Sequence, residues 1–161
     1  MLFRSLHIEQ ELIGESVGSQ DQIAASYGGF NLIEFYRSGN FSVMPMIINQ
    51  DRLFELESHL MLFFTGFSRI ANEIAKSKIE NFKNRERELK SIQDMVKEGV
   101  KVLSSANIEI EEFGRLLDSG WQQKRRLSEK VSSSAIDQIY DVAIRSGAIG
   151  GKILGAGGGG F

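Results

Sequence analysis

The C-terminal segment from Gly147 to Phe161 holds eight glycines in fifteen residues. Glycine lacks a Cβ atom, so such a segment lets the backbone approach a ligand closely and adopt positive φ angles. Successive backbone N–H groups in turns of this kind form concave sites for anions such as phosphate. The composition therefore indicates a phosphate-binding loop or, because glycine loses the most conformational entropy on ordering, a flexible tail.

Spacing rules out the two commonest phosphate-binding loops. A P-loop requires Ser or Thr directly after its lysine, but Lys152 is followed by Ile153. Gly155, Gly157 and Gly160 have the spacing of a dinucleotide-binding fingerprint. That fingerprint also needs a following helix and an acidic residue about 20 positions later, and the printed sequence supplies neither. A third kind of loop and a flexible tail remain as interpretations.

The complete pattern, a helix followed by G-A-x-G-G-K-[IL]-x-G-A-G-G-G-G-F, resembles the C-terminal motif of the GHMP kinases. This superfamily is named after galactokinase, homoserine kinase, mevalonate kinase and phosphomevalonate kinase. Its motif is a strand leading into a tight loop beside the substrate and the nucleotide phosphates. The resemblance implies that the loop at the site consists of Gly155, Ala156, Gly157, Gly158 and Gly159.

A second stretch, Gly18-Ser-Gln-Asp21-Gln22, lies near the other end of the sequence. From the residues alone, Asp21 is a first-turn aspartate, which the positive end of a helix dipole favours. The stretch also resembles the G-x-x-D-Q segment of the galactokinase-like branch, whose aspartate is the catalytic base or the electrostatic partner of the attacking hydroxyl. The resemblance implies that Asp21 is the base, with Gly18 and Gln22 in the substrate-binding segment.

Further stretches resemble the bacterial D-glycero-D-manno-heptose 7-phosphate kinases, which phosphorylate the anomeric hydroxyl of a sugar phosphate. They are His7-Ile-Glu9, Gly29-Phe-Asn-Leu-Ile-Glu-Phe35, Leu62-Phe-Phe-Thr-Gly-Phe-Ser-Arg69 and Ser119-Gly-Trp-Gln-Gln-Lys-Arg-Arg-Leu-Ser128. Arg can hold a phosphate dianion through two hydrogen bonds, and Lys can hold it as a point charge. The resemblance implies that Arg69 and Lys124 bind the substrate, with Arg125 as a further candidate, although each also fits an ordinary charge on a helix surface.

The resemblance further implies ATP and Mg²⁺ as cofactors of a full-length enzyme. The P-x-x-x-G-L-G-S-S-type loop that binds the nucleotide phosphates in these kinases does not occur in this sequence. Positioning and charge stabilisation around the transferred phosphoryl group supply most of the catalysis. We therefore expect this chain to bind neither cofactor alone, to contain no metal site and to need an N-terminal kinase half as its partner for activity.

Other functions fit parts of the pattern. The fold could serve a non-catalytic module for binding or regulation, and a kinase of this superfamily could act on galactose, fucose or mevalonate instead of a heptose phosphate. Exposed apolar surface, expected where the nucleotide-binding half would pack, predicts self-association, with a homodimer as one form.

The apolar pattern predicts an α+β fold, and the resemblance implies an antiparallel sheet with helices packed on one face. A hairpin is predicted over 30–48, helices over 19–27 and 51–58, a doubly buried strand over 60–64, further helices from residue 68 onward and a strand over 148–154. Together with the resemblance, this divides the chain into 1–50, a remnant of the N-terminal catalytic region, and 51–161, a GHMP kinase C-terminal domain.

Composition limits the choice of partners and compartment. The formal net charge of −2 provides no basic field for nucleic acid or an anionic membrane. No apolar run reaches the roughly 20 residues of a membrane span, and no signal peptide is recognisable at the N-terminus. Without cysteine there is neither a disulfide nor thiolate chemistry. The sequence predicts a cytoplasmic protein that binds a small molecule.

Overall fold

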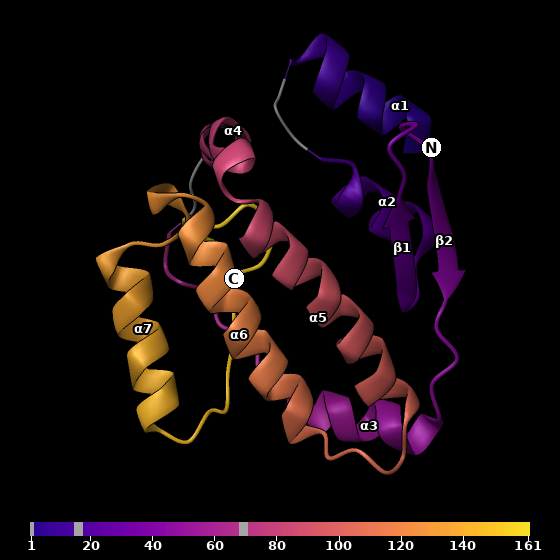
Figure 1. Ribbon diagram of the computed structural model, residues 1–161, viewed down its shortest axis with the longest axis vertical. Coiled ribbons are helices and arrows are strands. Elements are labelled where there is room, and N and C mark those ends of the chain that lie inside the picture. The colour runs from indigo at the N-terminus through magenta and orange to yellow at the C-terminus, as the bar shows by residue number, and fades with distance from the viewer. Residues whose placement is uncertain (1, 15–17, 68–70) are drawn as a thin grey trace. The chain divides into compact units, whose positions relative to one another are not determined.

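The computed structural model describes residues 2–14, 18–67 and 71–161 (Figure 1). The chain divides into two compact units, Met1–Ile47 and Ile48–Phe161. Assignment of the first unit to the end of an N-terminal catalytic region stays a prediction. Among the described residues, none of the helices combines the length and apolar character needed to cross a bilayer.

The first unit contains an antiparallel hairpin, as predicted. Strands β1 (Asn31–Phe35) and β2 (Phe41–Pro45) pair with Ile33 opposite Val43. The turn between them closes through a hydrogen bond of 2.9 Å from the Tyr36 N–H to the Asn40 carbonyl. Proline has no backbone N–H to donate to a neighbouring strand. Both strands of a two-stranded sheet are edge strands, so Pro45 at the end of β2 costs the sheet no hydrogen bond.

Helical segments precede the hairpin. They are α1 (Leu2–His7), the π-helical turn η1 (Ile8–Leu12) and α2 (Gln20–Tyr27). Ile23 of α2 is fully buried. The Tyr27 ring at the end of α2 meets the Phe41 ring of β2 edge-on, with centroids 6.5 Å apart, an arrangement that aromatic rings favour. These contacts attach α2 to the sheet.

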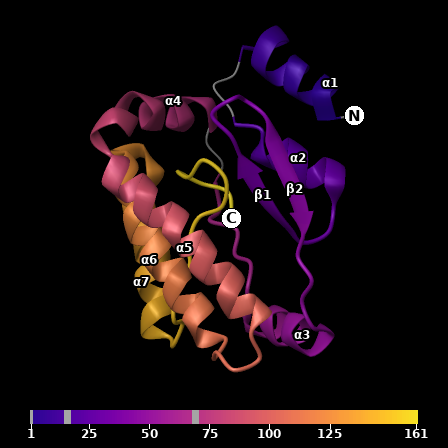
Figure 2. The same cartoon turned by 45° about the vertical axis from the view of Figure 1, so that its right-hand side comes forward.

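The regular secondary structure described in the second unit is helical. Its helices are α3 (Gln50–His59), α4 (Ala71–Asn81), α5 (Glu86–Ser104), α6 (Glu111–Leu127) and α7 (Ser134–Arg145), with 3₁₀ turns at Phe82–Asn84 and Glu129–Val131. Helices α5 and α6 run side by side (Figures 1 and 2). Gly99 is buried where α5 approaches Phe113 of α6, because a small residue allows the two helices to pack closely. With the hairpin, these helices confirm the α+β class.

A small apolar core packs against the C-terminal glycine-rich segment. Trp121 of α6 and Val131 are fully buried, and Ile74, Ile136 and Ile153 pack with them. Each of the five comes from a different segment between α4 and the glycine-rich stretch. The core therefore holds α4, α6, α7 and the glycine-rich stretch together.

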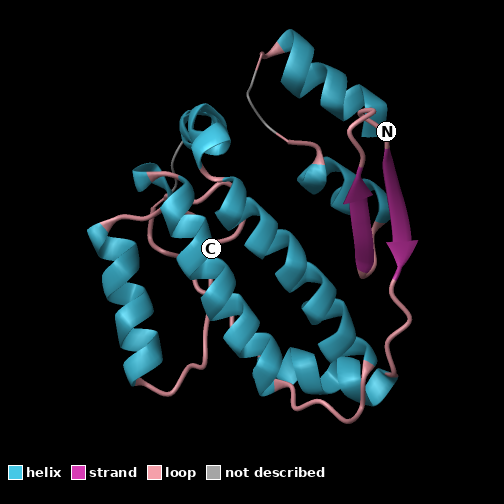
Figure 3. Ribbon diagram, in the orientation of Figure 1, coloured by secondary structure: helices cyan, strands magenta, loops and turns pink. Residues whose placement is uncertain are grey.

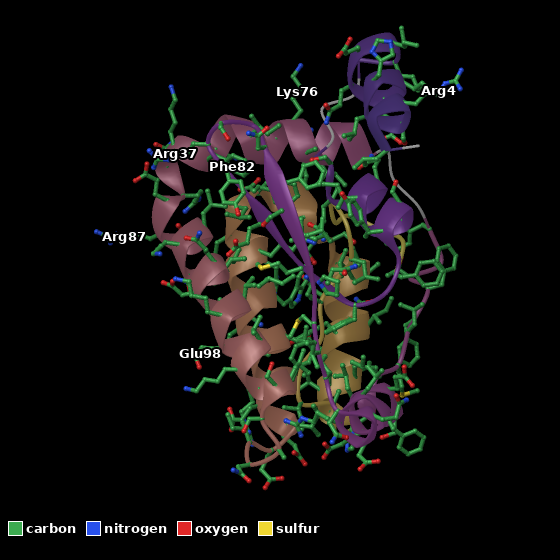
Figure 4. The ribbon with its side chains drawn as sticks, turned by 90° about the vertical axis from the view of Figure 1, so that its right-hand side faces the viewer. Arg4, Arg37, Lys76, Phe82, Arg87 and Glu98 are labelled. Atoms are coloured by element: carbon green, nitrogen blue, oxygen red, sulfur yellow. The ribbon has the colours of Figure 1, made fainter. Side chains whose placement is uncertain are left out.

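The charged run from 76 to 90 exposes most of its described side chains to solvent. It covers the end of α4 and the start of α5, and Lys76 and Arg87 both point outward in Figure 4. Farther along α5, Asp94 accepts contacts from Lys90 and Lys97, with N–O distances of 3.2 and 3.6 Å. Such exposed pairs contribute little to stability, so this surface mainly keeps α5 solvated.

The predictions of a strand over 60–64 and of another over 148–154 in the second unit are wrong. Residues 60–64 are irregular and each side chain is at least half exposed. Residues 148–154 form no strand either, and Figure 3 draws the chain after α7 as loop. A strand needs a neighbour to pair its backbone groups, and no described strand adjoins either segment. Five consecutive apolar residues cannot by themselves reveal whether such a neighbour is present.

Arg52 of α3 joins α3 to the connection between α5 and α6. Its buried guanidinium donates to the carbonyls of Val102 and Ile108, at 2.9 and 2.6 Å, and to the Glu55 carboxylate at 2.7 Å. Val102 lies in the last turn of α5, where carbonyls lack helical partners and a cation is favoured.

Replacing Arg52 by Met is therefore expected to lower the free energy of unfolding by about 2–4 kcal/mol, because two carbonyls lose a charged donor. Urea denaturation followed by circular dichroism measures the change. Arg115→Met removes an exposed cation that pairs with Glu112, and its expected cost is about 0.5 kcal/mol or less. Equal costs for the two variants would contradict the assigned role of Arg52.

Candidate active site

The glycine-rich segment folds into a packed loop. Gly157 and Gly158 are buried and adopt φ angles of +105° and +76°. A Cβ atom on Gly158 would lie 2.3 Å from Cδ1 of Ile74, and one on Gly157 would lie 2.9 Å from the Val131 carbonyl oxygen. Both the backbone conformation and the surrounding space require glycine here. These contacts favour the loop over the flexible tail.

Backbone hydrogen bonds hold the loop in place. The Gly158 N–H donates to the Val131 carbonyl at 2.8 Å, and the Gly160 N–H donates to the Phe67 carbonyl at 2.9 Å. Thr65 donates both its N–H and its hydroxyl to the Gly160 carbonyl, each at 2.8 Å. The loop is thus fixed from two directions, by Val131 in its middle and by 65–67 at its end.

Not every amide of the loop is used in this way. Within the part of the chain that the structure describes, no protein acceptor is paired with the N–H of Gly157 or of Gly159. Unpaired backbone N–H groups in a turn can contribute to a concave anion site. The loop therefore has donors that could serve a phosphate, whereas the Gly158 and Gly160 amides are already occupied.

Lys124 and Lys152 lie beside this loop in different environments. The Lys124 ammonium donates to the carbonyls of Ile153 and Gly155 at 2.9 and 2.8 Å. Lys152 keeps an exposed surface, although the protein around its side chain desolvates the ammonium enough to lower its pKa. Since water still reaches Lys152, that desolvation is partial. Lys124 is the lysine that contacts the loop directly.

Asp21 occupies the second position of α2, and its side chain is exposed. Among the described residues of the first unit, no ion pair or hydrogen bond engages its carboxylate. Gly18 is exposed just before the helix. Gln22 donates from Nε2 to a carboxylate oxygen of Glu9, while its buried Oε1 has no partner among the described residues. The Glu9 contact fixes the side chain that follows Asp21.

The sequence-predicted site residues fall into two groups. Gly18, Asp21 and Gln22 are brought together at the start of α2 in the first unit, and Lys124 is brought together with the loop 155–159 in the second. Arg69 lies outside the described residues. Arg125 pairs with Asp137 of α7 at 3.1 Å and stacks over Trp121, which indicates a structural charge.

Sequence reasoning missed residues that shape the loop through backbone groups or hydroxyls. Thr65 and Val131 hold the loop through hydrogen bonds at two points, and neither belongs to a recognisable phosphate motif. Asp118 accepts hydrogen bonds from Tyr140 and Gln122. A Cβ on Gly150 would lie 2.1 Å from the Gly114 carbonyl oxygen and 2.8 Å from the Asp118 backbone nitrogen. The sequence marked Gly150 only as a member of the glycine-rich motif.

Burial and the neighbouring Asp118 carboxylate raise the pKa of Tyr140 to about 12. Because an unfolded tyrosine titrates near pH ~10, the folded state favours the neutral phenol. Its contribution to stability is therefore complete below about pH 10 and is lost as the pH rises towards about 12. We expect a late phenolate step in an ultraviolet absorbance titration, which Tyr140→Phe removes. Persistence of the late step in Tyr140→Phe would assign it to another tyrosine and contradict this account.

A known protein family matches the C-terminal part of the chain. Residues 102–161 match the family model of the GHMP kinase C-terminal domain, described as "GHMP kinases C terminal". This match ends with the packed glycine loop and includes α6 and α7. Over residues 102–161 the chain therefore matches the C-terminal domain of the GHMP kinases.

Three curated proteins show where similar chains occur. A D-glycero-alpha-D-manno-heptose 7-phosphate kinase of Campylobacter jejuni is 35% identical over 155 residues, which are 96% of this chain and 45% of the relative. A bifunctional fucokinase/GDP-fucose pyrophosphorylase of Arabidopsis thaliana is 26% identical over 98% of this chain and 15% of its own. An L-fucokinase/L-fucose-1-P guanylyltransferase of Bacteroides fragilis is 29% identical over 98% of this chain and 17% of its own. The chain spans less than half the length of each.

Binding of Mg²⁺ requires several ligands close together. Among the described residues, no group of three or more His, Asp or Glu side chains is placed to hold a metal ion. Hard cations such as Mg²⁺ bind through oxygen ligands, commonly carboxylates. We therefore assign no metal ligand within the described residues.

Proposed function

We propose that this chain forms the C-terminal part of an ATP-dependent sugar kinase that phosphorylates the anomeric hydroxyl of a heptose 7-phosphate. The observation that carries the proposal is the similarity to the heptose 7-phosphate kinase over 96% of this chain. That similarity extends beyond the family-model match at 102–161 and includes the stretch around Asp21. A cytoplasmic location is part of the proposal.

In this proposal Asp21 is the catalytic base. Its exposed carboxylate at the start of α2 is accessible to a hydroxyl, and a base must come within hydrogen-bond reach of the proton it accepts. Asp21 would take the proton of the anomeric hydroxyl while that oxygen forms a bond to the γ-phosphorus and the bond to the leaving ADP oxygen breaks. The Glu9 contact of Gln22 helps to fix the segment that presents Asp21.

The proposal gives the glycine loop a role in binding phosphate. The N–H groups of Gly157 and Gly159 would donate to phosphate oxygens, and the packed backbone would keep these donors oriented without reorganisation. ATP with Mg²⁺ would supply the phosphoryl group and offset its charge. Because the sequence has no P-x-x-x-G-L-G-S-S-type loop, we expect little phosphotransfer by the 161-residue chain alone.

A fucokinase function is the second candidate. Two relatives with fucokinase in their names match 98% of this chain, at 26% and 29% identity. Fucose carries no phosphate, so a fucokinase would need no cationic site for one. The two candidates therefore differ in whether the enzyme requires a phosphorylated sugar.

A substrate comparison tests the proposal. The complete kinase containing this chain would be given ATP, Mg²⁺ and, in separate reactions, heptose 7-phosphate, fucose, galactose and mevalonate. We expect kcat/KM for heptose 7-phosphate to exceed the others by about 100-fold or more, since charged recognition discriminates strongly. Preference for fucose would replace the first candidate with the second, and transfer to none of the four would reject both.

A further inference from the structure

Lys124 makes a contact that differs from the substrate-binding role predicted from the sequence. It lies on α6 one turn after Trp121, which is fully buried and anchors that face of the helix in the core. From there its ammonium reaches across to the segment that leads into the glycine loop. It donates to the carbonyls of Ile153 and Gly155, two residues apart, at 2.9 and 2.8 Å.

The Ile153 carbonyl needs a donor because no strand supplies one. Ile153 is buried at 5% exposure, and 148–154 forms no strand. A buried carbonyl without a partner costs free energy. In a sheet, the N–H groups of a neighbouring strand would satisfy such a carbonyl. The ammonium of Lys124 takes that place.

Other contacts fix the rest of the loop. Val131 accepts from Gly158, and Thr65 and Phe67 hold Gly160. Between Ile153 and Gly155, the Leu154 N–H donates to the Phe161 carbonyl at 2.8 Å, whereas the Ile153 and Gly155 carbonyls are held by Lys124. The conformation of the chain that leads to Gly157 therefore depends in part on the Lys124 contact.

We propose that Lys124 is a positioning residue of the kinase site, whose ammonium fixes the start of the glycine loop and thereby aims the loop amides at phosphate. This role rests on the proposed function and replaces direct capture of the substrate phosphate by Lys124. The cation acts through the loop, and the backbone donors touch the substrate.

Hydrogen exchange of the 161-residue chain tests the role without any substrate. Lys124→Met keeps the aliphatic stem but removes the donors, and we expect exchange at the Leu154, Gly158 and Gly160 amides to rise about tenfold or more while α5 is unchanged. Lys97→Met is the matched control, since Lys97 is an exposed lysine of α5, and it should change neither region. Unchanged exchange over 153–161 in Lys124→Met would overturn the proposal.

A spectroscopic measurement on the unsubstituted chain covers the case in which Lys124→Met unfolds. With ¹⁵N-labelled lysine, an ammonium held by two carbonyls should exchange its protons with water more slowly than the exposed lysines and give its own cross peak. We expect one such peak for Lys124. If its protons exchange as fast as those of Lys97, the positioning role fails.

Kinetics of the complete kinase separate positioning from direct binding. Loss of positioning in Lys124→Met should lower kcat about tenfold or more while KM for the sugar phosphate stays within about twofold. A rise in KM with kcat unchanged would instead show that Lys124 binds the substrate and would overturn the proposal. Absence of sugar phosphorylation in the unsubstituted enzyme would reject the proposed function, whereas the exchange measurements would still decide whether Lys124 fixes the loop.

Discussion

Replacing Asp21 by Asn is expected to lower kcat for sugar phosphorylation in the complete kinase by roughly 100- to 10,000-fold, with little change in KM. The amide keeps the size of the side chain but cannot accept the proton of the attacking hydroxyl. The structure supports this choice because Asp21 is exposed at the start of α2 and no ion pair with a described residue of its unit occupies its carboxylate. Initial-rate kinetics with varied sugar phosphate measures the change.

Asp51→Asn provides a closely matched control. Asp51 is also an exposed aspartate at the second position of a helix, in this case α3. If the effect of Asp21→Asn came only from a lost interaction with the helix dipole, both substitutions would act through small changes in stability. We expect Asp51→Asn to keep kcat within about twofold. Undiminished kcat in Asp21→Asn would reject Asp21 as the base.

Gly158→Ala should be the most damaging small substitution in the glycine loop. The added Cβ would meet Ile74 at 2.3 Å and the Lys130 carbonyl at 3.0 Å, and the backbone has a φ angle of +76°. Overpacking and left-handed strain together are expected to cost about 2–5 kcal/mol of unfolding free energy. Denaturation monitored by Trp121 fluorescence measures the cost, because Trp121 belongs to the same core as Ile74.

Gly155→Ala separates the two contributions. Gly155 also has a positive φ angle, +55°, but a Cβ there would meet no atom within 4 Å. Only the backbone strain remains, with an expected cost of about 1–2 kcal/mol. If Gly155→Ala proved as destabilising as Gly158→Ala, contact with Ile74 and Lys130 would not explain the requirement for glycine.

Local patterns predicted much of the regular structure. The strand-forming residues on either side of the 37–41 turn gave the hairpin, because a hairpin is formed by contacts close in sequence. The helices predicted from residue 68 onward include α5, because helical periodicity is visible over neighbouring turns of the sequence. The same reasoning failed at 60–64 and 148–154, since strand formation there depends on a neighbour that local sequence does not specify.

The candidate site was predictable only where glycine or a short motif marked it. The packing of Gly158 against Ile74 joins residues far apart in sequence, so the density of glycine predicted a loop but not its contacts. Lys124 was predicted to bind the substrate, whereas its ammonium donates to backbone carbonyls of the segment that leads into the glycine loop. Charge and residue type do not distinguish a cation that binds substrate from one that binds a carbonyl.

The central claim is that this chain serves phosphoryl transfer to an anomeric hydroxyl, and the position of phosphate in the product tests it most directly. The complete kinase would be incubated with ATP, Mg²⁺ and heptose 7-phosphate, and the product examined by ³¹P nuclear magnetic resonance. We predict a second phosphorus resonance coupled to the anomeric proton, absent when Asp21 is replaced by Asn. A product phosphorylated at another oxygen, or no phosphorylated product, would contradict the account.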